Sequence, residues 1–388
     1  MAARRLAFNF NRALKSRTAV NAIKSRGFAS PITLPATTQC TTLSNGLTIA
    51  TEYSPWAKTS SVGVWIDAGS RAETDETNGT AHFLEHLAFK GTNKRTQHQL
   101  ELEIENMGAH LNAYTSREST VYYAKSFNSD VPKTVDILSD ILQNSKLDEG
   151  AIERERSVIL REQEEVDKQL EEVVFDHLHA TAFQGQPLGR TILGPRENIQ
   201  SIQRSHLTEY IKTNYTPDRM VLVGAGGVPH ETLVQLAREH FGSLPTATPA
   251  SAALAAAQKQ VPDFIGSDNL TNLDDLVHFT LREWTRLSFN VTEAEVERAK
   301  AQLKASILLS LDGTTAIAED IGRQIITTGR RMLPEEIERV IGKITEKDVM
   351  DFAQKKIWDQ DVAVSAVGSI EGLLDLPRIR NDMSRNAS

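Results

Sequence analysis

NGTAHFLEHLAFKG, residues 78–91, predicts a helix that has an apolar face and carries three ionisable side chains close together. At about 100° per residue, His82 and His86 lie about 40° apart, and Glu85 lies about 60° to the other side of His82. Two imidazoles one turn apart can hold one cation, while the carboxylate between them reaches a water on that cation. The spacing equally fits two hydrogen-bonded histidines at the edge of a packed helix, so these residues alone do not distinguish a metal site from a structural one.

Part of the chain repeats. The repeat has the same residue types at matching positions, and it indicates that one fold is used twice. LDEGAIERERSVILREQ (147–163) aligns with VTEAEVERAKAQLKASI (291–307) at an offset of 144, and IQRSHLTEYIKTNY (202–215) aligns with ITEKDVMDFAQKKI (344–357) at 142, as MVLVGAG (220–226) does with VAVSAVG (362–368).

The second copy of the repeat is incomplete. Its match begins near residue 274, so roughly 90 residues equivalent to 41–130 are missing from it. Of its strands only 361–367 is evident, and one strand cannot form a sheet with a buried face. We therefore expect an α+β protein with a mainly helical second half, an uncovered apolar surface and poor solubility. The expected parts are a catalytic domain at 41–243, a Pro/Ala/Ser/Thr-rich linker at 244–262 and a truncated second domain at 263–388.

The first copy shows both periods of regular structure. Alternating and β-branched runs predict strands, and apolar positions three or four apart predict helices. The expected strands are 47–53, 60–69, 110–116, 119–127 and 219–227, and the expected helices, besides 78–91, are 97–109, 130–144, 148–176, 202–214 and 230–242.

The helix expected at 148–176 offers the histidines a third ligand. Glu162 follows His86 by 76 residues, and Glu155 lies two turns before Glu162 on the same helix face. In the second copy the equivalent residues are Ala299 and Ser306, although the pattern around them is kept. Both carboxylates are lost where the repeat lacks the histidines, which favours a metal site over a structural one.

The first 28 residues differ in charge from the rest. They include seven Arg or Lys and no acidic residue, a composition typical of a mitochondrial transit peptide, and a disordered basic tail is the alternative. Removing them would lower the net charge from −8 by seven units to −15. An acidic body argues against nucleic acid and suggests a basic substrate or partner. The single cysteine, Cys40, excludes an internal disulfide, and no apolar run is long enough to span a membrane.

The H-x-x-E-H order and its surroundings resemble the pitrilysin/insulinase family of inverted-motif zinc peptidases. The segments that carry the resemblance are NGTAHFLEHLAFKGT (78–92), NAYTSRE (112–118), IERERSVILREQEEVDK (152–168), VVFDHLH (173–179) and QPLGRTILGP (186–195). It spans the leader, the first copy and the helical remnant of the second. It implies a sheet-plus-helices domain that occurs twice.

The resemblance also implies residue roles around one zinc ion. Zinc would be held by two imidazoles and a carboxylate, with a general base beside it and a further carboxylate orienting a ligand. The peptide would add as an extended strand, and two acidic residues would bind the arginine before the cut bond. The residues are His82, His86 and Glu162 for zinc, Glu85 and Glu155 for catalysis, and Asn112, Ala113, Tyr114, Glu172 and Asp176 for substrate.

The function implied is zinc-dependent endoproteolytic removal of N-terminal targeting presequences from proteins imported into mitochondria. The chain would act as the β-type partner of a noncatalytic α subunit, in the matrix or peripherally on the inner membrane. The alternatives are a noncatalytic or bifunctional core subunit of respiratory complex III and a stand-alone oligopeptidase. Because part of the second copy is missing, we expect that this chain can bind zinc but has low or no activity, and that inserting the absent segment near residue 267 restores activity.

Overall fold

The computed structural model describes residues 38–247, 274–367 and 377–379, together with 253, 256–258 and 381. The leader expected at 1–28 lies outside the described residues, as does most of the expected linker. The described chain is α+β, as the sequence predicts. Among the described residues, no helix is both long and apolar enough to cross a membrane.

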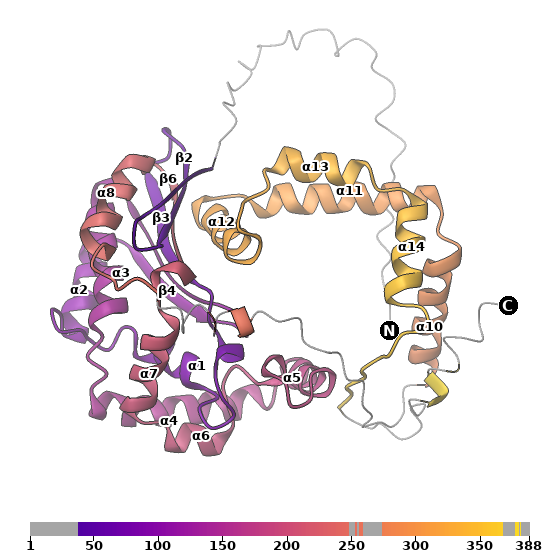
Figure 1. Ribbon diagram of the computed structural model, residues 1–388, viewed down its shortest axis with the longest axis horizontal. Coiled ribbons are helices and arrows are strands. Elements are labelled where there is room, and N and C mark those ends of the chain that lie inside the picture. Colours follow the sequence, from indigo (N-terminus) through magenta and orange to yellow (C-terminus); the bar gives the residue numbers. More distant parts are fainter. Residues whose placement is uncertain are drawn as a thin grey trace, which may run out of the picture. The chain divides into compact units, whose positions relative to one another are not determined.

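The first half of the described chain, residues 38–247, forms one six-stranded mixed sheet (Figure 1). The strand order is β1-β2-β6-β3-β5-β4, in which β2 and β6 are parallel and all other neighbours are antiparallel. The strand β1, which includes the exposed Cys40, was not expected from the sequence. The bounds are β1 Gln39–Thr42, β2 Thr48–Tyr53, β3 Thr59–Ile66, β4 His110–Thr115, β5 Thr120–Phe127 and β6 Met220–Gly226.

The described part of the first half has eight α-helices, of which α3 and α8 pack on one face of this sheet and α5 extends away from it (Figure 1). The helix predicted at 148–176 is in fact two, because it is interrupted at 167–169, a polar stretch with no apolar side chain to anchor a further turn. The bounds are α1 Thr80–Leu87, α2 Gln97–Asn106, α3 Val131–Asn144, α4 Glu149–Val166, α5 Leu170–Ala182, α6 Arg196–Ser201, α7 Arg204–Asn214 and α8 His230–Phe241.

The second half is helical in its described part, as predicted, and its helices keep the repeat offsets. Helix α11 begins 144 residues after α4, and both helices are 18 residues long. Helix α14 begins 142 residues after α7, and both are 11 residues long. The strand predicted at 361–367 is wrong, since this stretch has no strand partner among the described residues to complete a ladder. The bounds are α10 Asp274–Phe289, α11 Glu293–Ser310, α12 Thr314–Thr328, α13 Pro334–Gly342 and α14 Glu346–Lys356.

The two faces of the sheet are covered by different halves of the chain. Helices α3 and α8 pack on one face, where Val135 and Leu233 join Val62 and Val64 in the main core. Helix α12 of the second half packs on the other face (Figure 1). There a second core forms from nine buried residues, Ala50, Trp65, Val121, Val221, Val223, Ala225, Ala318, Ile321 and Ile325.

Close approach of α12 to the sheet depends on a glycine and a buried ion pair. A Cβ on Gly322 would lie 2.3 Å from an atom of the Trp65 ring, so only glycine fits there. Arg331, which follows α12, is buried and pairs with Glu52 on β2 and with Asp320 on α12. Removing one partner of such a buried pair leaves an unpaired charge.

The N-terminus of α1 is capped by a residue outside the helix. The buried Glu73 carboxylate accepts hydrogen bonds from the backbone N–H of Gly79 and Ala81 at 2.8 and 2.6 Å, and from the Asn78 amide at 2.8 Å. Gly79, directly before the helix, has a φ of +104°, which favours glycine, and it has no side chain that could cap the helix. Glu73 therefore fixes the start of the helix that carries the two histidines.

Replacing Gly322 with alanine is expected to weaken the packing of α12 on the sheet. Because the Trp65 ring is itself buried, the added methyl group forces a shift costing about 1–3 kcal/mol of unfolding free energy. Urea denaturation measures this change. Thr327→Ala, at an exposed position of the same helix, is the control and is expected to change stability by less than about 0.5 kcal/mol.

The buried Glu73 should make stability depend on pH. Burial raises the pKa of Glu73 from 4.5 to about 7, against the lowering effect of its three donors. A raised folded-state pKa means that the folded protein holds this proton more tightly, so the contribution is complete below about pH 4.5 and is lost as pH rises through about 7. The stability difference between the natural chain and Glu73→Gln, from urea titrations at pH 5 and pH 8, should therefore shrink at pH 8. A difference that grows with pH would contradict this assignment.

Candidate metal centre

The three predicted ligands come together from two helices. Glu162 Oε2 on α4 lies 3.0 Å from His86 Nε2 and 3.7 Å from His82 Nε2 on α1. The two imidazole rings meet edge to face, with centroids 4.7 Å apart. Helices α1 and α4 pack directly against each other, and Ile159, three residues before Glu162, is fully buried in the main core. This packing brings a carboxylate from 76 residues away within reach of both rings.

The donor set fits a divalent metal such as zinc. One potential ligand atom from each of His82, His86 and Glu162 lies within 4.8 Å of the others, and this is the one such group found in the described part of the chain. His82 is buried, and its Nδ1 has no hydrogen-bond partner among the described residues. Burial, together with the nearby His86, lowers the pKa of His82 to about 4, which keeps this ring neutral, as a metal ligand must be.

Glu155 lies behind His86, where the sequence placed it. Its Oε2 is 3.3 Å from His86 Nδ1, on the side of the ring opposite Glu162, and its Oε1 is 2.9 Å from the Lys90 ammonium. Burial lowers the pKa of His86, but the Glu162 and Glu155 carboxylates outweigh it and raise that pKa. A carboxylate in this position fixes the ring orientation and the nitrogen that faces Glu162. The pairing of Glu155 with Lys90 was not expected.

Glu85 lies beside the ligands without belonging to their cluster. Burial raises the pKa of its carboxyl group, so the group is more basic than an exposed glutamate. It lines a cavity of about 510 Å³ together with His86 and Glu155. The rest of the lining comes from α2, β4 and the residues after α1; it includes the apolar Phe89, Leu100, Ile104 and Leu111 and the charged Lys90, Glu101 and Glu105.

The predicted peptide-binding strand is β4, which lies at an edge of the sheet. Among the described strands it pairs with β5 alone, so its other side is available to a further strand. Asn112 and Ala113 line the same cavity as Glu85. The Tyr114 side chain points to the opposite face of the sheet, where its hydroxyl donates to Glu319 of α12 at 2.6 Å. Tyr114 can therefore contact a peptide at this edge through its backbone alone.

The two acidic residues expected to bind arginine lie on α5, not on the helix of Glu162. They are four residues apart, as i and i+4 on one face. Glu172 is exposed, whereas Asp176 forms an ion pair with Arg117 in the β4–β5 turn. Sequence reasoning missed this partner. No spacing signal marks it, because 59 residues separate the two.

The chain matches two family models and a set of curated relatives. Residues 48–196 match the model described as Insulinase (Peptidase family M16), and residues 201–267 match the Peptidase M16 inactive domain. The mitochondrial-processing peptidase subunit beta of Neurospora crassa is 60% identical, with 100% of both chains covered. The proteins of the same name from Saccharomyces cerevisiae and Homo sapiens are 43% and 42% identical, covering 95% and 98% of this chain and 100% and 96% of theirs.

The Neurospora alignment also shows how much this chain lacks. It extends over 477 positions, and this chain has 388 residues, so at least the difference of 89 positions has no residue here. The match to the inactive-domain model stops at residue 267. That is close to residue 274, where the second copy of the repeat begins without its strands.

Solved structures share the fold. A chain of complex III2 from Candida albicans superposes with a TM-score of 0.75 at 23% identity, covering 89% of this chain and 99% of that one. A protease from Helicobacter pylori gives a TM-score of 0.71 at 18% identity, covering 82% and 96%. At such identities the likeness concerns the fold alone. The whole-length identity of 60% goes further, and the chain belongs to the insulinase family of peptidases, peptidase family M16.

Proposed function

We propose that this chain is the catalytic subunit of a zinc endopeptidase that removes targeting presequences from proteins imported into mitochondria. The observation that carries the proposal is the meeting of His82, His86 and Glu162 within coordinating distance of one another, beside Glu85. The relatives named as processing-peptidase β subunits, similar along the whole chain, support the substrate class. A scaffold protein has no need of this complete set of side chains, which favours the peptidase over a purely structural subunit.

The residues around the centre have distinct tasks in peptide hydrolysis. His82, His86 and Glu162 would hold one zinc ion, which when bound polarises the peptide carbonyl and lowers the pKa of a water. Glu85, made more basic by burial, would accept the proton of the attacking water and return it to the leaving amine. Glu155 would hold the His86 ring in place.

Substrate binding would combine an open strand edge with a cavity that is apolar in part. A peptide added to β4 would be held by backbone hydrogen bonds, which do not depend on its sequence. The cavity beside Glu85, lined by Phe89, Leu100, Ile104 and Leu111, suits an apolar side chain next to the cut bond. Such a site would select a peptide by its charge pattern and by one apolar residue.

Charge would provide the preference for basic peptides. Residues 148–176 contain eleven acidic and four basic side chains, a net charge of −7. Glu172 and Asp176 are the proposed partners of an arginine before the cut bond. Since Asp176 already pairs with Arg117, a substrate arginine would have to share or replace that pair. We further propose that the subunit acts in mitochondria with a noncatalytic α-type partner.

The roles of Glu85 and Glu162 can be separated by two isosteric variants. Glu85→Gln should keep the metal content of the natural chain and lower presequence cleavage by about 10²–10⁴-fold, because only the proton acceptor is lost. Glu162→Gln should lower metal content, because an anionic ligand is lost. Metal analysis and cleavage by the chain with its α-type partner, and by the chain with the missing segment restored near residue 267, test both. Undiminished cleavage by the metal-loaded Glu85→Gln variant would refute the assignment.

The acidic pair on α5 predicts a charge-dependent KM. Glu172→Gln and Asp176→Asn should each raise the KM for a presequence peptide with arginine before the cut bond by about tenfold, since a charge-assisted hydrogen bond contributes about 1.5–3 kcal/mol. A peptide with citrulline there should show little change. Glu171→Gln, exposed on the same helix, is the matched control. Equal effects of all three substitutions on KM would show that the peptide responds to the total negative charge of α5 and not to Glu172 and Asp176 in particular.

A further inference from the structure

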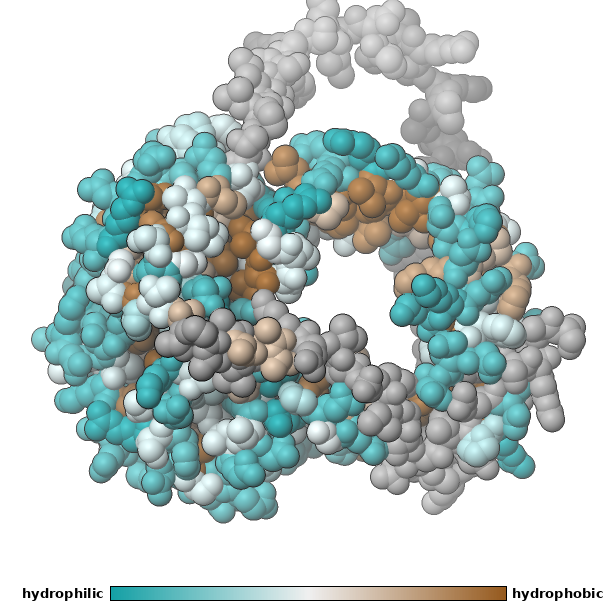
Figure 2. Space-filling view, viewed as in Figure 1, coloured by the Kyte–Doolittle hydropathy of each residue, from teal (hydrophilic) through white to brown (hydrophobic). Residues whose placement is uncertain are grey.

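Equivalent residues in the two copies differ sharply in burial. Val135 and Ile159 of the first copy are 0% exposed, whereas their equivalents Phe279 and Leu303, at offset 144, are 58% and 48% exposed. At offset 142, Tyr210 is 6% exposed and Phe352 is 62% exposed. The second copy thus has core side chains without the core that would cover them. Figure 2 shows hydrophobic side chains gathered along α11, on its side away from α13.

The first copy shows what covers such positions. Val135 and Ile159 belong to the main core, which is built around strands β2, β3, β5 and β6 and helix α1. Except for β6, all these elements lie in 41–130, the part that has no equivalent in the second copy. The Neurospora alignment has 89 or more unmatched positions, and the family match ends at residue 267; we infer from the repeat that the loss lies there.

The stretch 361–367 packs as its equivalent in the first copy does, although it forms no strand. Val362 and Val364 pack with Leu281 of α10, as their equivalents Met220 and Leu222 of β6 pack in the main core. Ala363, together with Val362, lines a cavity shared with α5. Its equivalent, Val221, packs in the core that α12 covers. The stretch is therefore placed like the central strand of a second sheet that has no neighbouring strands among the described residues.

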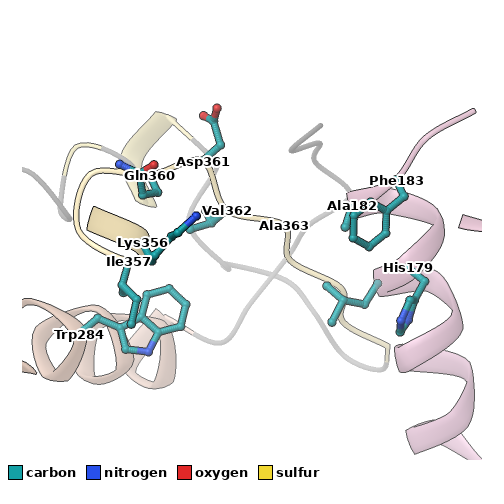
Figure 3. Close-up of a pocket in the computed structure, with 11 residues that line it drawn as sticks. His179, Ala182, Phe183, Trp284, Lys356, Ile357, Gln360, Asp361, Val362 and Ala363 are labelled. Atoms are coloured by element: carbon teal, nitrogen blue, oxygen red, sulfur yellow. The ribbon is translucent and has the colours of Figure 1, made fainter. Parts of the chain in front are cut away.

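A cavity of about 380 Å³ lies beside this stretch, and its lining is mainly apolar. As Figure 3 shows, His179 and Ala182 of α5, with Phe183 directly after it, lie on one side of it, and Trp284, Lys356 and Ile357 lie on the other. Helix α5 has the same place in the repeat as α12, which covers the first sheet. In this arrangement α5 is the helix that would cover a second sheet.

We propose that the second half is a docking surface for an amphipathic β-sheet segment on a separate polypeptide, which pairs with 361–367 and packs between α5 and α10. The occupant has the chemistry of the lost strands: alternating apolar residues on both faces and free backbone groups at an edge. A second copy of this chain does not offer this, because both faces of its sheet are already covered, one by α3 and α8 and the other by α12.

The direct test uses the full chain and one defined probe. The probe is the segment of the Neurospora crassa relative that falls in the alignment gap, expressed as a separate polypeptide. We expect a 1:1 complex by analytical ultracentrifugation and slower amide hydrogen exchange at 361–367. Exchange at β4 should be unchanged, which separates this binding from peptide addition at the proposed active site.

Matched variants identify the surface. Phe279→Asp and Leu303→Asp should each weaken binding of the probe at least tenfold. Leu102→Asp, at a leucine of α2 that is 42% exposed against 48% for Leu303, should leave binding unchanged. Absence of binding by a chain that keeps its helical circular dichroism and its metal would overturn the proposal. So would self-association through the same residues that the probe does not displace.

Discussion

The packing of α4 against α1 is the interaction on which the candidate site depends. Helix α1 presents both imidazoles from one turn, but it contains no third ligand of its own. The buried Ile159 anchors α4 in the main core, and Glu162 follows it by three residues at the α1 side. A shift of one turn, about 5.4 Å, would take the carboxylate out of coordinating reach. Core packing therefore determines the geometry of the metal centre.

Two further contacts make that geometry rigid. Glu73 caps α1 from outside the helix, and Glu155 with Lys90 holds the far side of the His86 ring. These carboxylates are themselves buried, and the donors around them offset part of the cost of desolvation. Charged groups outside the ligand set thus support the centre, which is the arrangement that precise ligand placement needs.

Each half contributes one helix to the other half, and this explains why the first sheet is covered on both faces. The first sheet is complete because α12, from the second half, covers the face that α3 and α8 leave open. In return α5 extends from the first half toward 361–367, where no second sheet exists in the described chain. The same exchange places Glu172 and Asp176 on a helix whose other contacts are incomplete. Because α5 is incompletely packed, we expect the missing segment to affect the proposed substrate binding by these two residues as well as solubility.

The sequence by itself determined the family and the fold class, and it predicted the duplication and the three candidate ligands that the fold brings together. Each of these is written in local patterns: the HFLEH turn, the alternation of β2 to β6, and an offset of 144 that α4 and α11 reproduce. Pattern could not show that 148–176 breaks in two, because charged residues carry no packing information at 167–169. It also suggested a strand at 361–367, where the propensity is real but the hydrogen-bonding neighbours are absent.

Only the tertiary structure decided which distant groups meet. Examples are the hydrogen bonds of Glu73 at the start of α1, the ion pair of Arg117 with Asp176, and the hydrogen bond of Tyr114 to Glu319. No periodicity in the sequence indicates any of these contacts. Such contacts depend on how helices and strands pack, and that depends on side-chain volume over the whole core. Local patterns determine the elements and the chemistry they carry. Packing decides which side chains the folded chain brings within bonding distance.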